Sequence, residues 1–191
     1  MTILRRPFYF LRHGEADWNV SRMCIGQLDR PLTPKGRTQA DDARRHCAGL
    51  NISTVFHSPL SRAADTAALV MRGRAVPFVS DDGLLEACLG VKQGAREDDA
   101  ADPFLRNWIR GGAIDDAETY VGFRTRVRDA VNRCLAATDG VPLIVAHAGV
   151  YHALRDLMRA PVGRVYHCVP YGHEPIGNEP QGTEWHIEVV L

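Results

Sequence analysis

Residues 7–15 read PFYFLRHGE, a short apolar and aromatic run that ends in Arg-His-Gly. An unbroken apolar run of this length is typical of a strand buried on both faces, and the glycine after it is typical of a loop. We therefore predict a strand at residues 7–11 whose carboxyl end places a basic pair in a loop. A second run, VPLIVA at residues 141–146, predicts a central buried strand that ends at His147.

The rest of the chain alternates between helix and strand patterns. Helix patterns cover residues 34–49, 61–71, 118–137 and 150–158, and further strand patterns cover residues 54–57, 76–79 and 185–191. Two segments predict irregular structure: residues 89–117, with a short helix near 104–109, and residues 162–182, a loop rich in Pro, Gly and His. The alternation predicts a single α/β domain over residues 1–191, a three-layer α/β/α sandwich with a mostly parallel central sheet.

The composition excludes several classes of partner. Hydrophobic residues make up 45% of the chain and charged residues 24%, which is ordinary for a globular protein. Lys and Arg number 23, and so do Asp and Glu, so the net charge is zero. Such a chain has no basic field to attract nucleic acid or an anionic membrane, and we expect neither as a partner.

Cysteine spacing and the amino-terminal residues indicate the compartment. No two cysteines have the short spacing of a zinc or redox motif, which favours reduced thiols in a cytoplasmic protein. Residues 1–11 lack the long apolar region of a signal peptide, and no apolar run is long enough to cross a bilayer. The oligomeric state stays open, with a homodimer as the commonest assembly.

Three polar groups follow predicted strands. Arg12-His13 follows the first strand, residues 58–62 (SPLSR) follow the second, and His147 follows VPLIVA. Ligands of parallel α/β sheets bind in the crevice outside the carboxyl ends of the strands. Helices that begin nearby expose free backbone N–H groups, which favour an anion. The sequence therefore predicts an anion site built from these three groups.

The chemistry of Arg12-His13-Gly14 fits phosphoryl transfer. A neutral imidazole can attack phosphorus when its other nitrogen is held by a hydrogen bond, and a guanidinium can grip two phosphoryl oxygens. Glycine lets the backbone approach the ligand closely. Three residues alone leave a second interpretation open, an ordinary strand-to-loop turn with a solvated histidine.

Further motifs follow this segment in a fixed order. They are Trp18-Asn19, Arg22, Gly26, Asp29, Pro31-Leu32-Thr33, Gly36, Gln39-Ala40, residues 58–63 (SPLSRA), Thr66-Ala67, Leu85-Glu86, Gly90, Gly94 and residues 145–150 (VAHAGV). This ordered set, which spans roughly residues 8–154, resembles the signature of the histidine phosphatase (phosphoglycerate mutase-like) superfamily. The resemblance implies the phosphoglycerate mutase-like fold.

The resemblance also implies roles for single residues. His13 would form a phosphohistidine, and Glu86 would protonate the leaving oxygen and then help water to attack. The side chains implied around the phosphoryl oxygens are hydrogen-bond donors: Arg12, Arg62, His147 and Asn19. The backbone amides of Ala148 and Gly149 would bind substrate, although the family usually has glycine where this chain has Ala148. The resemblance implies no metal ion and no cofactor, because the cationic side chains supply the positive charge.

The segment after Glu86 bears on the type of reaction. Residues 95–118 are short and acid-rich: Glu97, Asp98, Asp99, Asp102, Asp115, Asp116 and Glu118 outnumber Arg96, Arg106 and Arg110. Acids facing the site would disfavour highly anionic substrates, and Ile25 replaces a polar residue of the mutase members. We therefore expect hydrolysis of a small phosphomonoester. The alternatives are a phosphoglycerate mutase and a non-catalytic module that binds a phosphorylated ligand.

The remaining histidines are expected to be packing or surface residues: His46, His57, His152, His167, His173 and His186. None pairs with acids or cysteines at metal-binding spacing. Glu118 has two interpretations, the counterpart of an acid that precedes the family's long helix or a plain acid at a helix N-terminus.

Overall fold

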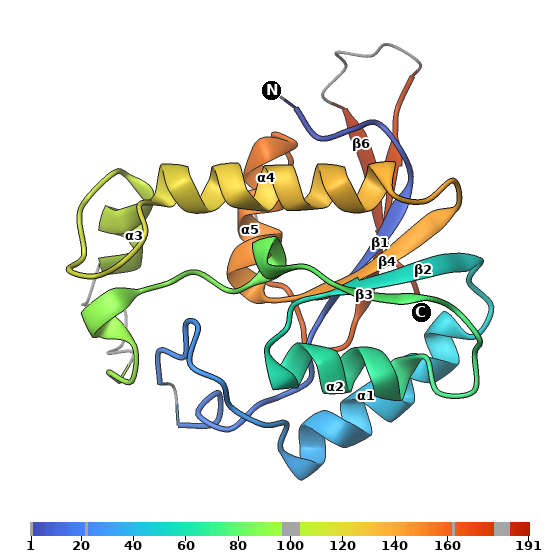
Figure 1. Ribbon diagram of the computed structural model, residues 1–191, viewed down its shortest axis with the longest axis horizontal. Helices are drawn as coiled ribbons and strands as arrows, with labels where there is room; N and C mark the ends of the chain where they lie inside the picture. Colours follow the sequence, from blue (N-terminus) through green and yellow to red (C-terminus); the bar gives the residue numbers. More distant parts are fainter. Residues whose placement is uncertain (1, 22, 97–103, 162, 178–183) are drawn as a thin grey trace.

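The computed structural model describes residues 2–21, 23–96, 104–161, 163–177 and 184–191. At its centre is a sheet with strand order β3-β2-β4-β1-β5-β6 (Figure 1). The strands are β1 (Phe8–Arg12), β2 (Ile52–His57), β3 (Phe78–Ser80), β4 (Val141–Ala146), β5 (Pro170–Pro175) and β6 (Trp185–Val189). Three pairings are parallel (β1–β4, β2–β4 and β2–β3), whereas β5 runs antiparallel to both β1 and β6. The predicted mostly parallel sheet is confirmed.

Helices cover both faces of this sheet, as Figure 1 shows. The helices are α1 (Pro34–Cys47), α2 (Ser61–Val70), α3 (Phe104–Ile109), α4 (Tyr120–Ala136) and α5 (Ala148–Leu157), with two 3₁₀ turns, η1 (Asp82–Leu84) and η2 (Gly90–Lys92). The pair α1 and α2 packs on one face, and α4 and α5 pack on the other. The three layers confirm the predicted α/β/α architecture.

The central strand β4 shows why the VPLIVA run contains no polar residue. Leu143 and Val145 belong to the core on the α1–α2 side, while Ile144 and Ala146 belong to the core on the α4–α5 side. All four side chains are fully buried. Successive side chains of a strand point to opposite faces, so a strand covered on both faces must be apolar throughout.

The loop after β1 is fixed by close backbone packing against the start of α1. Thr33 caps that helix, because its hydroxyl accepts a hydrogen bond from the Gly36 amide at 3.0 Å. A Cβ atom at Gly14 would overlap the Gly36 carbonyl oxygen, so no larger residue fits there. The glycine after His13 therefore lets the loop lie directly on the first turn of α1.

The expectation that residues 162–182 form a loop is wrong for its middle part, which is strand β5. Its sequence, PYGHEP, lacks apolar alternation, so local pattern gave no strand signal. Pairing on both sides and stacking between Phe8 and His173, with ring centroids 4.4 Å apart, hold the strand instead. Helix α5 also begins two residues earlier than predicted, with His147 at its N-cap.

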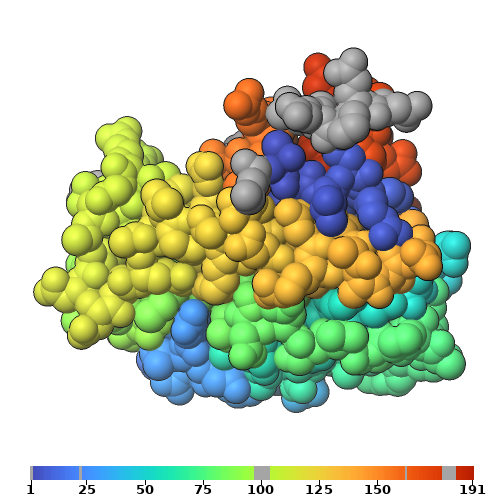
Figure 2. Space-filling view, turned by 45° about the horizontal axis from the view of Figure 1, so that its top comes forward, coloured from blue at the N-terminus to red at the C-terminus, as the bar shows by residue number. Residues whose placement is uncertain are grey.

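The amino-terminal segment lies over the end of α4, beside the last strands (Figure 2). The Leu4 amide donates to Asn132 Oδ1 at 2.8 Å, and Asn132 Nδ2 donates to the Thr2 carbonyl at 3.1 Å. Arg6 Nη1 donates to the Leu135 carbonyl at 2.6 Å. These hydrogen bonds attach the residues before β1 to the helix layer on that face.

Two further expectations concern the compartment. No helix within the described ranges has both the length and the apolar character that crossing a bilayer requires. All five cysteines fall within those ranges, and none of them forms a disulfide bond: Cys24, Cys47, Cys88, Cys134 and Cys168.

His173 gives the fold a testable pH dependence. Burial lowers its pKa from the ordinary 6.5 to about 3, so the folded chain keeps this ring neutral where the unfolded chain protonates it. The unfolded state therefore binds more protons as the pH falls below 6.5, and stability is lost through that window. We expect His173→Phe, which retains an aromatic ring beside Phe8, to lower the dependence of the unfolding free energy on pH between 6.5 and 4 by up to about 1.4 kcal/mol per pH unit.

Urea denaturation at several pH values measures both slopes. The readout is the difference in the pH dependence of the unfolding free energy between His173→Phe and the unsubstituted protein, because the other titratable groups contribute equally to both. Equal slopes would contradict the assignment of His173 as a buried neutral histidine.

Candidate active site

The carboxyl ends of β1, β4 and β2 bring the predicted residues together. The His13 amide donates to the Ala146 carbonyl at 3.0 Å, and the Ser58 amide donates to the Val145 carbonyl at 3.1 Å. The rings of His13 and His147 lie 5.1 Å apart between centroids. His13, Arg62 and His147 are exposed by only 4%, 1% and 0%, so the predicted site is a buried polar cluster rather than a solvated turn.

The ring of His13 is held in one tautomer. Its Nδ1 lies 2.7 Å from the Gly14 carbonyl oxygen, and a carbonyl can only accept, so Nδ1 carries the proton. Burial, and then the neighbouring His147, Arg62 and Arg12, hold the pKa of His13 well below 6.5. The ring is therefore neutral at pH 7, and its Nε2 lone pair is available as a nucleophile.

His147 lies at the N-cap of α5 and is fixed by Ser58. Its Nε2 is 2.8 Å from the Ser58 hydroxyl, whereas its buried Nδ1 has no hydrogen-bond partner among the described residues. Burial, followed by Arg62 and Arg12, lowers the pKa of His147 well below 6.5. A buried polar nitrogen without a partner is rare in proteins and marks a place where a ligand atom can bind.

Two guanidinium groups lie in the same cluster. Arg62 donates through Nη1 to the Leu28 carbonyl at 2.9 Å and through Nη2 to the Gly26 carbonyl at 2.8 Å. These bonds fix the planar fork, and its Nε has no partner within the described chain. Burial lowers the pKa of Arg62, but a guanidinium stays charged in proteins. Arg12, at the end of β1, donates to the Val165 carbonyl at 2.9 Å.

The carboxyl group of Glu86 is oriented by two backbone amides. Its Oε1 accepts from the Ala87 amide at 2.9 Å, and its Oε2 accepts from the Gly149 amide at 3.0 Å. A Cβ atom at Gly149 would overlap Oε1, so a larger residue at this position would displace the Glu86 carboxyl group. Gly149 was expected to bind substrate through its amide, but here that amide donates to Glu86. Ala148, its neighbour, lines the cavity described below.

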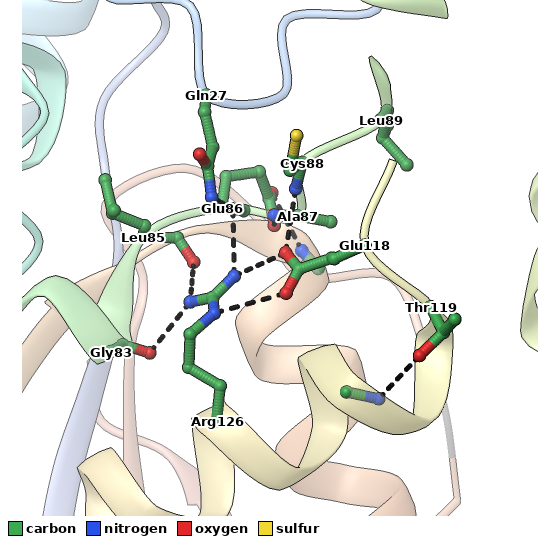
Figure 3. Close-up of polar contacts among 12 residues, drawn as sticks. Gln27, Gly83, Leu85, Glu86, Ala87, Cys88, Leu89, Glu118, Thr119 and Arg126 are labelled. Carbon is green, nitrogen blue, oxygen red and sulfur yellow. Dashed lines mark hydrogen bonds and ion pairs between the residues drawn. The ribbon is translucent and has the colours of Figure 1, made fainter. Parts of the chain in front are cut away.

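Arg126 holds the backbone around Glu86, as Figure 3 shows. It donates to the carbonyls of Gly83 at 3.0 Å and Leu85 at 2.9 Å, and to that of Glu86 at 3.3 Å. It also pairs with Glu118, with 2.6 Å between Nη2 and Oε1. The Glu118 carboxylate is thus paired with Arg126 of α4. Neither sequence interpretation of Glu118 included this ion pair.

A cavity of about 540 Å³ opens from this cluster. Arg12, His13, Arg62 and Glu86, which interact electrostatically with one another, form its phosphoryl end, and the half-buried Asn19 also lines it. The rest of the wall is mainly apolar: Met23, Cys24, Ile25, Ala87, Leu89, Leu105, Trp108, Ile109, Tyr120 and Phe123. In Figure 1, α3 and the loop that carries Asn19 lie on the same side of the molecule. The volume suits a small-molecule ligand.

The described acids of residues 95–118 do not line the large cavity. Asp115 and Asp116 are exposed, and neither they nor Glu118 line the cavity. Four of the acids, Glu97, Asp98, Asp99 and Asp102, lie outside the described residues. Among the described residues of this segment, it is the apolar side chains of α3 that line the cavity.

A smaller hollow of about 280 Å³ adjoins the first at Arg12, Asn19 and Met23. Its other lining residues are Arg164, Val165, Tyr166 and His167. The ring Nδ1 of His167 donates to the His13 carbonyl at 2.7 Å, and burial lowers its pKa to about 4. His167 and His152, both expected as packing or surface residues, therefore lie at the site, whereas His173 packs in the core as expected.

Sequence reasoning missed Arg126 and His152. Each is an ordinary polar residue of an amphipathic helix, and nothing in the local pattern separates it from its neighbours. In the described part of the chain, no three His, Cys, Asp or Glu side chains are grouped so that they could hold a metal ion.

Comparison with known proteins decides the family. The signature described as "Histidine phosphatase superfamily (branch 1)" matches residues 8–171. The chain belongs to this superfamily. The resemblance of the sequence motifs to this superfamily is confirmed, and so is the expected fold.

The named relatives include both a mutase and a phosphatase. The chain is 33% identical over 146 residues to a probable phosphoglycerate mutase GpmB of Enterobacter sp. (strain 638), which covers 73% of this chain and 68% of that protein. Bacillus stearothermophilus YhfR superposes with a TM-score of 0.82 at 27% identity, over 96% and 95% of the two chains. A mycobacterial glucosyl-3-phosphoglycerate phosphatase in complex with VO3 also gives 0.82 at 27% identity, over 96% and 98%.

The Arg126 network predicts a stability effect. Arg126→Leu removes the ion-pair partner of Glu118 and one donor from each of three backbone carbonyls, so we expect a loss of about 1–3 kcal/mol in unfolding free energy. Arg128→Leu is the matched control, because Arg128 lies on the same helix and pairs with its sequence neighbour Asp129. Urea denaturation measures both variants. An equal, small effect of the two substitutions would contradict the role of Arg126.

Proposed function

We propose that this protein is a metal-independent phosphatase that hydrolyses a small phosphomonoester through a phosphohistidine on His13. One observation carries the proposal. A neutral imidazole with its Nδ1 proton committed to a carbonyl lies in a buried cluster with His147 and the Arg62 guanidinium, at the end of a ligand-sized cavity. This pairs a nucleophile with fixed positive charge.

The first chemical step transfers the phosphoryl group. His13 Nε2 attacks phosphorus, the ester P–O bond breaks, and the leaving oxygen takes a proton from the carboxyl group of Glu86. When the Ser58 hydroxyl donates to His147 Nε2, the proton of His147 lies on Nδ1, which then donates to a phosphoryl oxygen. Arg12, Arg62 and Asn19 supply further donors where charge develops, and each hydrogen bond to a charged group contributes about 1.5–3 kcal/mol.

The second step returns the enzyme to its starting state. The Glu86 carboxylate takes a proton from water, the hydroxide attacks the phosphohistidine, and the P–N bond breaks to release inorganic phosphate. His13 is again neutral and Glu86 again protonated, so the two steps balance. A positioned general acid or base of this kind contributes about 10²–10⁴-fold in rate.

The cavity supports hydrolysis over isomerisation of phosphoglycerate. A mutase must hold a second anionic group of its substrate. The described lining residues of the large cavity include two cationic side chains, Arg12 and Arg62, and both lie at the phosphoryl end. Two of the solved structures with similar folds are titled phosphatases or their complexes. The curated name of the GpmB relative keeps the mutase as the second candidate.

A simple assay tests the proposed mechanism. We expect hydrolysis of 4-nitrophenyl phosphate and of an alkyl phosphate in excess chelator, and near-complete loss of both with His13→Ala. Glu86→Gln should reduce turnover of the alkyl phosphate by about 10²–10⁴-fold. The nitrophenyl ester should lose less, because its leaving phenolate needs no proton. His46→Ala, on the exposed face of α1, is the matched control. Unchanged turnover in His13→Ala would end the proposal.

Product analysis separates the two enzyme classes. During incubation with 3-phosphoglycerate, we expect free phosphate to form without faster production of 2-phosphoglycerate, because the described lining of the large cavity has no cation besides Arg12 and Arg62 for the carboxylate. Phosphorus NMR follows both products at once. Faster appearance of 2-phosphoglycerate would reassign the protein as a mutase, with His13 still required.

A further inference from the structure

We infer that the group esterified to phosphate in the preferred substrate is uncharged and largely apolar, a bulky alkyl or aryl alcohol rather than a hydroxy acid or a polyol. This inference rests on the proposed function and specifies the substrate class of the same site. It follows from the wall of the large cavity, which changes from cationic to apolar within one continuous space.

The buried part of the wall is apolar. Trp108 and Phe123 are exposed by only 4% and 1%, and Ile25 and Leu89 by 8% and 7%. The indole N–H of Trp108 donates to the Glu118 carbonyl at 2.7 Å, and its ring packs edge-on against Tyr120 with centroids 5.2 Å apart. The polar atom of the indole is thus satisfied within the protein, and the cavity meets the ring itself.

The outer rim is apolar as well. Leu105 and Ile109, one helical turn apart on α3, are 38% and 51% exposed and both line the cavity. Large apolar side chains left in water beside a ligand site mark a surface that a ligand covers. Burial of a ligand's methylene groups against them stabilises the complex by about 0.8 kcal/mol each, or about fourfold in affinity.

Among the described residues that line the large cavity, the polar groups beyond the phosphoryl end offer no net charge to the ligand. Asp156 is paired with Arg124, with 2.8 Å between Nη1 and Oδ2, and accepts from the Tyr120 hydroxyl at 3.3 Å. Burial lowers the pKa of His152, so its ring is neutral at pH 7. A carboxylate on the substrate would therefore find no counter-ion among the described residues of this region, which is costly.

Binding and turnover are tested with two matched series. Linear alkylphosphonates from ethyl to hexyl cannot be hydrolysed, so calorimetry reports their affinity independently of catalysis. The corresponding alkyl phosphates share one type of primary alcohol leaving group, so kcat/KM reports the chain alone. We expect the Kd of the phosphonates to fall by about threefold to fourfold per methylene. Butylphosphonate should bind at least about tenfold more tightly than 4-phosphonobutyrate, which carries a carboxylate.

Variants of α3 connect the effect to this wall. The double variant Leu105→Gln, Ile109→Gln should reduce the gain in affinity per methylene to below about twofold. Both residues are exposed, so these substitutions leave the core intact. Val121→Gln is the control, because Val121 is 71% exposed and lies outside the cavity lining. This control should keep the full dependence on chain length.

The outcomes separate this inference from the proposed function. A flat chain-length profile, or tighter binding of 4-phosphonobutyrate, overturns the inference even where hydrolysis depends on His13. Affinity that rises with chain length supports it. Rising affinity without hydrolysis of any alkyl phosphate supports the inference about the pocket and refutes the proposed phosphatase.

Discussion

The site depends on the parallel pairing of β1 with β4. In this register Arg12 lies opposite Ala146, so His13 and His147, which are far apart in the chain, leave adjacent strands at the same level. Parallel strands need crossover connections, and these place helices on both faces of the sheet. The pairing that brings the two imidazoles together therefore also surrounds them with protein.

Burial then separates the charge states of the polar groups in one small volume. It penalises the charged form of every group, but the groups differ in how far they can respond. An imidazole titrates close to neutrality, so burial makes His13 and His147 neutral. A guanidinium titrates far above neutrality, so Arg62 remains a cation although its pKa is also lowered. A lone pair and a fixed positive charge can thus coexist side by side.

The sequence was most informative where an apolar strand and the site residue that follows it lie in one segment. The strands β1 and β4 are apolar because both faces are covered, and His13 and His147 follow them directly, so fold and cluster could be predicted together. Strand β5 could not be predicted, because its residues are held by stacking on Phe8 and by its two neighbours rather than by an apolar pattern.

The sequence also did not predict which residues line the cavity or which residues support Glu86. Arg126 and His152 lie on amphipathic helices, and only the packing of α4 and α5 against other segments gives them their partners. The acids of residues 95–118 were an argument against highly anionic substrates on the condition that they face the site. Their composition was correct, but a one-dimensional count does not show which side chains face the ligand.

Glu118, the ion-pair partner of Arg126, also contacts Trp108 of the pocket wall. Glu118 accepts from Arg126 and from the Cys88 amide through its carboxylate, and from the Trp108 indole through its carbonyl. Glu118 thus anchors two parts of the pocket. Through Arg126 and the Cys88 amide it holds the segment that carries Glu86, and through Trp108 it holds helix α3 of the apolar wall. Under the proposed function, this shared anchor couples the range of substrates to the catalytic rate. A change that remodels the wall around Trp108 will also shift Glu86, and the effects of paired substitutions there will not add.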